Sequence, residues 1–141
     1  MKKYVLDANA VLILLEGRDG AQRVKKFIQE AARTRSPIYL SAVNWGEVIY
    51  SLWRAEGEAA VRMFVREAVS PSLVVLAADR ERATRAAQLK AVHDLGYADS
   101  FAAALAMELG ATLVTADPEF QKLGKKLKVE FLPRHERRAR K

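Results

Sequence analysis

Short apolar runs alternate along the chain with longer stretches in which apolar residues recur at helical spacing. Most of the short runs are nearly continuous in Val, Ile and Leu, which is typical of strands buried on both faces. We predict strands at Lys3–Leu6, Ile38–Leu40, Leu73–Leu76, Thr112–Thr115 and Lys128–Leu132. We predict helices at Ala8–Leu15, Ala21–Thr34, Ala42–Glu56, Glu58–Ala68, Arg80–Leu95 and Ser100–Leu109. This alternation predicts an α/β fold, a three-layer sandwich with a central parallel sheet.

Residues at the predicted helix ends support these boundaries. Ser41 and Asp79 are good N-cap residues for the helices that follow them. Gly57 separates two helices, and Gly110 ends the alanine-rich helix Ser100–Leu109. Gly96 is a candidate C′ residue for the helix that precedes it. Four of the predicted helices therefore have a chemical reason to begin or end near their stated bounds.

Three aspartates lie where these elements meet polar turns. Asp7 follows the first predicted strand, Asp117 follows the fourth, and Asp99 opens the helix Ser100–Leu109. The carboxyl ends of parallel strands meet at one edge of a sheet, where open α/β folds bind ligands. Carboxylates packed together there would raise each other's pKa unless a cation joined them. The aspartates are therefore candidates for one site.

Glu47 is a fourth candidate for the same site. It lies inside a predicted helix, little more than one turn beyond a strand end. Capping cannot explain it, although a solvent-facing glutamate on an amphipathic helix is a common alternative. For Asp7, Asp99 and Asp117, the alternative is a helix N-cap. Those alternatives do not explain why all four acids should lie at the same edge of the sheet, so the four acids together favour a functional site.

A site made only of oxygen ligands suits a hard divalent ion, Mg²⁺ or Mn²⁺, and such sites cleave phosphodiesters through metal-activated water. Asn9 could orient the ion or donate to a phosphate oxygen. Thr115 stands two residues before Asp117 and could equally be an ordinary strand residue. His93 and His135 have no serine, cysteine or metal-ligand partner at useful spacing, so we assign both to the surface.

The 141 residues suffice for one domain with a sizeable core, and we divide them into a nuclease-like domain, 1–132, and a basic tail, 133–141. No apolar run is long enough to span a bilayer, so no membrane association is expected. The chain has no cysteine, which removes disulfides and thiolate metal sites. This composition suits the cytoplasm.

The net charge of +7 is concentrated at the end of the sequence. Residues 1–121 hold 15 basic and 15 acidic side chains, which cancel. Residues 122–141 hold 9 basic side chains against Glu130 and Glu136, so this segment carries the whole excess of +7. A basic end on a neutral domain suggests a polyanionic partner. For the last eight residues, a solvated tail is an equal alternative.

The order and spacing of these residues resemble the PIN-domain ribonucleases, and in particular the toxins of VapBC-type toxin–antitoxin pairs. The resemblance runs from Lys3 to about Leu132, and it is carried by the acids with Asn9 and Thr115. Its most specific stretches are Gly96–Ala106 and the segment from Gly110 to Phe120. It implies a Mg²⁺- or Mn²⁺-dependent endoribonuclease that acts on RNA, is bound by a cognate antitoxin protein and forms a homodimer.

The resemblance also implies roles for single residues. Asp7 and Asp99 would be the main metal ligands, Asp117 would complete the site, and Glu47 would hold a second ion or the attacking water. The products would carry a 5′-phosphate and a 3′-hydroxyl. Two alternatives stay open: a catalytically idle PIN-like RNA-binding or assembly module, and a Mg²⁺-dependent phosphoacceptor or phosphatase-like domain. The second would require an acid where the chain has Asn9, or one in Leu73–Leu76.

A partner surface is expected on two consecutive helices. Five large apolar residues lie on them: Trp45, Tyr50, Trp53, Met63 and Phe64. Core packing is the alternative for each, but two adjacent helices cannot easily hide all five against one sheet face. We therefore expect a hydrophobic groove along Ala42–Ala68 that binds an antitoxin segment whose end reaches the acidic site. Trp53 is the candidate anchor.

Overall fold

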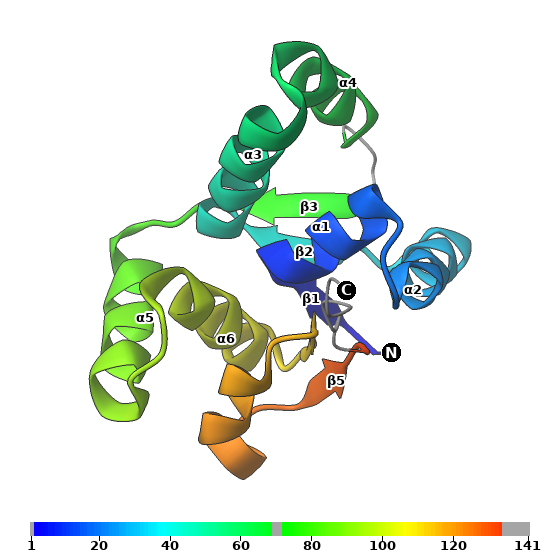
Figure 1. Cartoon of the computed structure of the whole chain (residues 1–141). Helices are drawn as coiled ribbons and strands as arrows, with labels where there is room; N and C mark the ends of the chain where they lie inside the picture. Colours follow the sequence, from blue (N-terminus) through cyan, green and yellow to red (C-terminus); the bar gives the residue numbers. More distant parts are fainter. Residues whose placement is uncertain (1, 69–71, 134–141) are drawn as a thin grey trace, which may run out of the picture.

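One parallel sheet organises the molecule. The computed structural model describes residues 2–68 and 72–133 (Figure 1). The strands are β1 (Tyr4–Leu6), β2 (Ile38–Ser41), β3 (Leu73–Leu76), β4 (Thr112–Thr115) and β5 (Val129–Phe131). Their order is β3-β2-β1-β4-β5, and every neighbouring pair is parallel. The predicted α/β fold with a central parallel sheet is confirmed, and all five strands lie within a residue of their expected positions.

Helices cover both faces of this sheet. They are α1 (Ala8–Glu16), α2 (Ala21–Thr34), α3 (Ala42–Glu56), α4 (Glu58–Ala68), α5 (Arg80–His93), α6 (Tyr97–Leu109) and the 3₁₀ helix η1 (Pro118–Lys126). Three of them, α2, α3 and α4, have the predicted bounds. The helix η1 was not predicted, and it is kinked at Gly124. None of the helices within residues 2–68 and 72–133 is both long and apolar enough to cross a membrane.

The core is split between the two faces because strand side chains alternate. On β1, Leu6 packs with α1 and α2, whereas Val5 packs with α6 and η1. The alanines that line the inner side of α6 are buried, which allows this helix to lie close to the sheet. The three layers are therefore α1 to α4, the sheet, and α5, α6 and η1.

The connection between α5 and α6 differs from the prediction. Helix α5 ends at His93, and Asp94, with φ 53°, takes the left-handed position that we had expected Gly96 to take. The earlier ending allows Leu95 to be fully buried beneath the helices. Helix α6 then begins at Tyr97 with Gly96 as its N-cap, so Asp99 lies within the first turn. Asp99 does not cap the helix, and the capping alternative is wrong for this residue.

Candidate functional site

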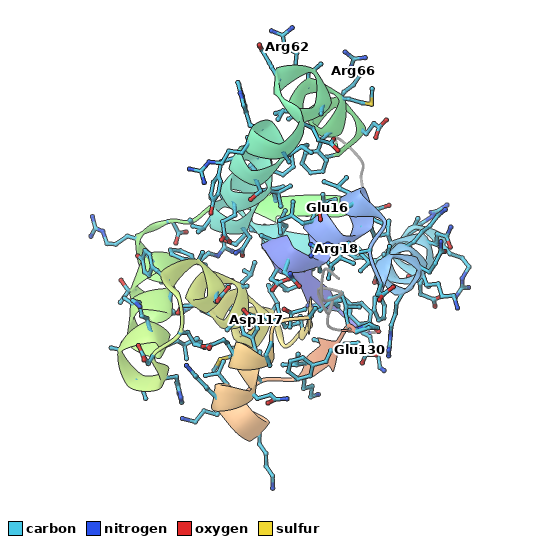
Figure 2. All side chains as sticks on the ribbon, viewed as in Figure 1. Glu16, Arg18, Arg62, Arg66, Asp117 and Glu130 are labelled. Atoms are coloured by element: carbon cyan, nitrogen blue, oxygen red, sulfur yellow. The ribbon has the colours of Figure 1, made fainter. Side chains whose placement is uncertain are left out.

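The candidate site lies where the strand order reverses. From β1, the chain continues to β2 on one side of the sheet, whereas β4 pairs with β1 on the other side. Such a switch point leaves a crevice at the carboxyl ends of the two strands. Asp7 follows β1 and Asp117 follows β4, at its junction with η1 (Figure 2). The two strand-end aspartates therefore meet at the edge that the sequence predicted.

Asp7 is held by hydrogen bonds from two directions, and it is only 1% exposed. Its Oδ1 accepts from the backbone N–H of Ala10 at 2.8 Å, so the residue does cap α1. Its Oδ2 accepts from the hydroxyl of Thr115 at 2.5 Å. The Thr115 hydroxyl in turn accepts from the backbone N–H of Asp117 at 3.0 Å. Thr115 is therefore more than a β-branched strand residue, because it links the carboxylate after β1 to the turn after β4.

Asn9 supports the same turn from α1. Its Oδ1 accepts from the backbone N–H of Ala116 at 3.1 Å. Asp117 caps η1 through the backbone N–H of Glu119 at 2.9 Å. The capping roles of Asp7 and Asp117 and their place in the site are thus compatible, since a carboxylate has two oxygens and several lone pairs.

Asp99 has no such support. Its carboxylate folds back over Gly96, where a Cβ would stand 3.2 Å from Oδ2, so any other residue at this position would push the Asp99 carboxylate aside by a few tenths of an ångström. No side chain or backbone group among the described residues donates a hydrogen bond to this carboxylate, although it is partly buried. A buried charge without a donor or a cation is costly. Of the four acids in the site, Asp99 therefore receives the least stabilisation of its negative charge from the protein.

Glu47 is positioned by a residue that the sequence analysis missed. The amide nitrogen of Asn44 donates to Glu47 Oε1 at 2.9 Å and to the carbonyl oxygen of Ala98 at 3.1 Å. Asn44 is fully buried, and it ties Glu47 on α3 to the residue just before Asp99. Its Oδ1 has no partner among the described residues. The only sequence signal for this contact is the spacing of three between Asn44 and Glu47 on one helix.

The carboxylates of the site are close enough to raise one another's pKa. Burial raises the pKa of Asp7 to about 7, although the hydrogen bonds from Thr115 and Ala10 act against it, and the charges of Asp99 and Asp117 raise it further. The pKa of Asp99 is raised to about 6, first by burial and then by the charge of Asp117. Glu47 and Glu119 act on Asp99 in the same direction. Glu119, which the sequence analysis also missed, thus belongs to the acidic surroundings of the site.

One cation stands at the border of these acids. Lys122 Nζ lies 2.7 Å from Glu119 Oε2 and 3.3 Å from the carbonyl oxygen of Asp94. The hydrogen bond to Glu119 raises the pKa of Lys122, and the charges of Asp94 and Asp117 contribute. Lys122 therefore pairs at the surface with Glu119, and no Lys or Arg among the described residues forms an ion pair with Asp7 or Asp99.

The donor set fits a hard divalent ion. The site offers carboxylate oxygens that repel one another, and neither sulfur nor an imidazole accompanies them. Within residues 2–68 and 72–133, no three Asp, Glu or His side chains are close enough together to enclose an ion by themselves. Mg²⁺ usually keeps several waters in proteins, so direct contact with each carboxylate is not required.

The comparison with known families decides the relationship of the chain. The family model described as PIN domain matches residues 4–126. The chain belongs to the PIN domain family. No similar sequence was found among the curated proteins.

Solved structures share the fold of this PIN domain. VapBC2 from Rickettsia felis, bound to a promoter DNA fragment, has a TM-score of 0.73 at 18% identity over 93% of this chain and 99% of that one. A toxin–antitoxin complex from Klebsiella pneumoniae has a TM-score of 0.64 at 20% identity, covering 90% and 95%. VapC20 from Mycobacterium tuberculosis, a Sarcin-Ricin loop cleaving toxin, has a TM-score of 0.69 at 18% identity, covering 86% and 95%.

Proposed function

We propose that this PIN domain is a divalent-metal-dependent endoribonuclease and the toxin of a toxin–antitoxin pair. The observation that carries the proposal is the carboxylate of Asp99, which is partly buried beside other acids and has no donor among the described residues. An acid in this environment gains most from a bound cation. An idle binding module would not need to keep such a charge.

Asp7, Glu47, Asp99 and Asp117 would hold Mg²⁺ or Mn²⁺, directly or through ordered waters. When bound, the ion would activate a water for in-line attack on phosphorus and neutralise charge on the phosphate. Asp7 and Asp99 would be the main ligands, because both carboxylates are buried or partly buried beside other acids and a cation would offset their mutual repulsion. Glu47 would hold a second ion or the attacking water.

The other residues of the site fix these carboxylates and leave the nucleophile to water. Thr115 orients Asp7, and Asn44 orients Glu47. The nearest hydroxyl in sequence to Asp99 is that of Ser100, which is fully buried and donates to the carbonyl oxygen of Gly96 at 2.9 Å. Hydrolysis by water would leave a 5′-phosphate and a 3′-hydroxyl, as the family resemblance implies.

The toxin role is supported by a groove on the opposite side of the sheet from α6. It has a volume of about 160 Å³, and its aliphatic and aromatic lining comes from α1, α3 and α4: Leu12, Leu15, Leu52, Ala55, Ala60, Met63 and Phe64. Glu16, Glu56 and Glu67 surround it. Arg62 and Arg66 project from α4 away from the body of the molecule (Figure 2). An apolar groove with an acidic rim fits an amphipathic antitoxin segment that carries basic residues.

We named Trp53 from the sequence as the anchor residue of the groove, but Trp53 lies outside the groove lining. It is 51% exposed, so it is available to a partner, but the side chains that line the groove do not include it. Trp45 packs inward against Phe64, with ring centroids 5.2 Å apart. Met63, which is 59% exposed and lines the groove, is the better candidate anchor. Trp53 and Tyr50 remain available for the homodimer contact that belongs to this proposal.

The direct test is RNA cleavage by the purified chain with Mn²⁺ or Mg²⁺ and with excess EDTA. We expect cleavage only with the metal, and we expect Asp99→Asn to reduce it by at least about a hundredfold while the fold is retained. Asp19→Asn is the matched control, because Asp19 is an exposed aspartate in a turn. Metal-dependent cleavage that survives in Asp99→Asn would refute the site, and wild-type protein that binds RNA without cleaving it would favour the idle module.

A further inference from the structure

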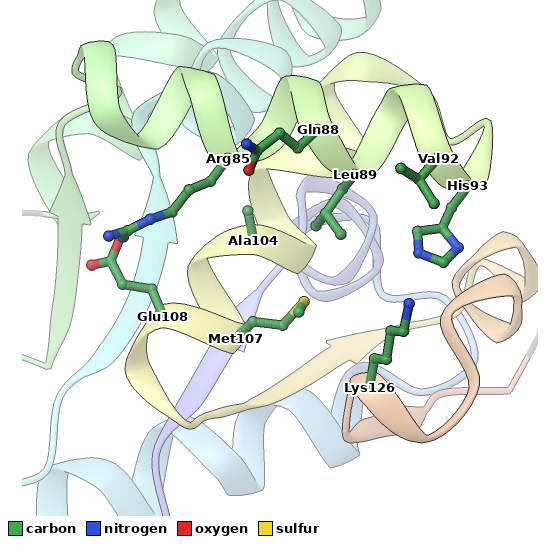
Figure 3. A pocket seen from close by; sticks show the side chains of 9 residues that line it. All are labelled: Arg85, Gln88, Leu89, Val92, His93, Ala104, Met107, Glu108 and Lys126. Carbon is green, nitrogen blue, oxygen red and sulfur yellow. The ribbon is translucent and has the colours of Figure 1, made fainter.

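A second cavity lies on the other face of the sheet, between α5, α6 and η1. Its volume is about 500 Å³, and Figure 3 shows the side chains that line it. Leu89 and Val92 from α5 and Ala104 and Met107 from α6 form an aliphatic floor. Val92 is 73% exposed, which is unusual for a side chain of this kind. A cavity of this size corresponds to a small-molecule or single-nucleotide ligand.

Three charged side chains line this cavity, Arg85, Glu108 and Lys126, and of these only Lys126 has no ion-pair partner among the described residues. Arg85 is occupied, because its guanidinium pairs with Glu108 at 2.9 Å and with Glu81 at 2.8 Å. Lys126 from η1 and His93 from the end of α5 have no hydrogen-bond or ion-pair partner among the described residues. In Figure 3, the Lys126 amino group points toward the His93 ring at one end of the cavity. A free ammonium and a ring that can donate through N–H are therefore directed at the same place.

The helix η1 runs from the acidic site to this cavity. Asp117 is its N-cap, Lys122 lies before the kink at Gly124, and Lys126, which lines the cavity, lies after the kink. Lys122 bonds to the carbonyl oxygen of Asp94, the residue that directly follows His93. A polyanion that leaves the acidic site along η1 would thus meet Lys122 first and the cavity next.

We propose that this cavity binds one nucleotide of single-stranded RNA at a position away from the cleaved bond. The base would lie on the aliphatic floor, and its phosphate would be bound by Lys126 and His93. The proposal rests on the endoribonuclease function, since it assigns the substrate of that same site. A nucleotide fits better than an acidic peptide helix because the apolar floor is short and because the lysines of η1 extend from it toward the acidic site.

Binding can be measured without cleavage in excess EDTA, by fluorescence anisotropy of a labelled single-stranded RNA. Lys126→Met should weaken binding about tenfold more than Lys125→Met, an adjacent exposed lysine that does not line the cavity. Val92→Asp should also weaken binding, because it places a negative charge beside the phosphate. Val65→Asp on α4 is its control, since Val65 is exposed on a different surface.

Cleavage kinetics separate an effect on binding in this cavity from an effect on the cleavage site. With Mn²⁺, Lys126→Met should raise KM for the long RNA and leave cleavage of a trinucleotide unchanged, because the trinucleotide does not reach the cavity. Equal effects of Lys126→Met and Lys125→Met would overturn the proposal and leave only a general effect of charge. Unchanged RNA binding by both cavity variants, with lost binding of polyglutamate, would overturn it in favour of an acidic protein partner.

The two hypotheses fail in different ways. If wild-type protein cleaves no RNA with any metal, the endoribonuclease function is wrong, and the anisotropy comparison still tests the cavity. If wild-type protein cleaves RNA and Lys126→Met matches Lys125→Met, only the cavity proposal is wrong.

Discussion

The groove over α1, α3 and α4 and the cavity between α5, α6 and η1 resemble each other in lining and differ in charge. Both have aliphatic floors, and both expose a large apolar side chain, Met63 in the groove and Val92 in the cavity. The groove is surrounded by acids, of which Glu56 and Glu67 have no ion-pair partner among the described residues. The cavity instead has Lys126 without such a partner.

This difference shows that an apolar floor alone does not identify a ligand. Burial of apolar surface favours any partner of suitable shape, whereas the charges at the rim select partners of the opposite charge. The acidic groove suits a basic protein segment, and the basic cavity suits a polyanion. The carboxylates of the candidate site lie at the sheet edge between the two layers. If this is correct, substitutions on the two surfaces should separate protein binding from RNA binding.

The largest effect is expected for Met63→Glu in the groove. It would place an unpaired carboxylate on the apolar floor, which costs about 3 kcal/mol in an interface, or a factor of about a hundred in affinity. The measurement is co-purification and titration with the antitoxin that the proposed function implies. Trp53→Ala is the comparison, because Trp53 is exposed and does not line the groove. Release by Trp53→Ala alone would restore the original anchor hypothesis. RNA cleavage by the free chain should not change in either variant.

The next effect is expected for Asn44→Ala, which acts on the acids between the two surfaces. Without the amide donor, Glu47 loses its link to Ala98, and cleavage should fall by about ten- to a hundredfold, in kcat more than in KM. Asn44→Asp is the matched variant, since it keeps the size of the side chain and removes the donors. Binding of the groove partner should be unaffected. A folded Asn44→Ala protein with the wild-type kcat would show that this contact is only structural.

A smaller effect is expected in the melting temperature of metal-free protein. Asp7 and Asp99 lose their protons at about pH 7 and about pH 6 in the folded state, compared with 3.8 for a free aspartate. The folded state therefore binds more protons in this window, and raising the pH from about 4 to about 7 should lower its stability. Scanning calorimetry should show this decrease, a weaker decrease in Asp99→Asn, and recovery of stability on addition of Mn²⁺ at neutral pH. A melting temperature that rises through this window in wild type and Asp99→Asn alike would contradict the assignment.

The smallest effect is expected from truncation after Pro133. The segment removed falls outside the described residues, and it holds five basic residues and Glu136, so the net charge falls by 4. RNA binding should weaken, and the slope of log affinity against log salt should flatten by about 0.7 for each lost phosphate contact. An unchanged slope would mean that the tail takes no part in binding, and the basic cavity would then have to supply the contacts.

The sequence alone predicted the fold, and it predicted that Asp7 and Asp117 lie at one edge of the sheet, because both features depend on local signals. The roles of the four acids stay a prediction. Apolar runs at strand spacing and capping residues such as Ser41 and Asp79 determine where elements begin, and both residues cap as predicted. A parallel sheet then brings the residues that follow its strands to one edge without further information. The position of Asp7 beside Asp117 follows from this rule.

The remaining features depend on contacts between distant segments. In the sequence, Asn44 is an ordinary polar residue in the first turn of a helix. Its contact with the Ala98 carbonyl oxygen forms only when α6 packs against α3 in the folded chain. Gly96 was expected to end α5, but burial of Leu95 ends that helix earlier, and Gly96 instead leaves room for the Asp99 carboxylate. Helix η1 is mostly polar, and its burial rests on Phe120 and Leu123, whose spacing of three matches a 3₁₀ turn.

The most direct test of the central claim is a Mn²⁺ titration of the purified chain at neutral pH, followed by isothermal calorimetry or electron paramagnetic resonance. The account predicts saturable binding by the wild-type protein and by Asp19→Asn, and affinity lowered by at least about tenfold in Asp99→Asn. Equal Mn²⁺ affinity in all three proteins, with the fold retained, would contradict the assignment of these carboxylates as a metal site.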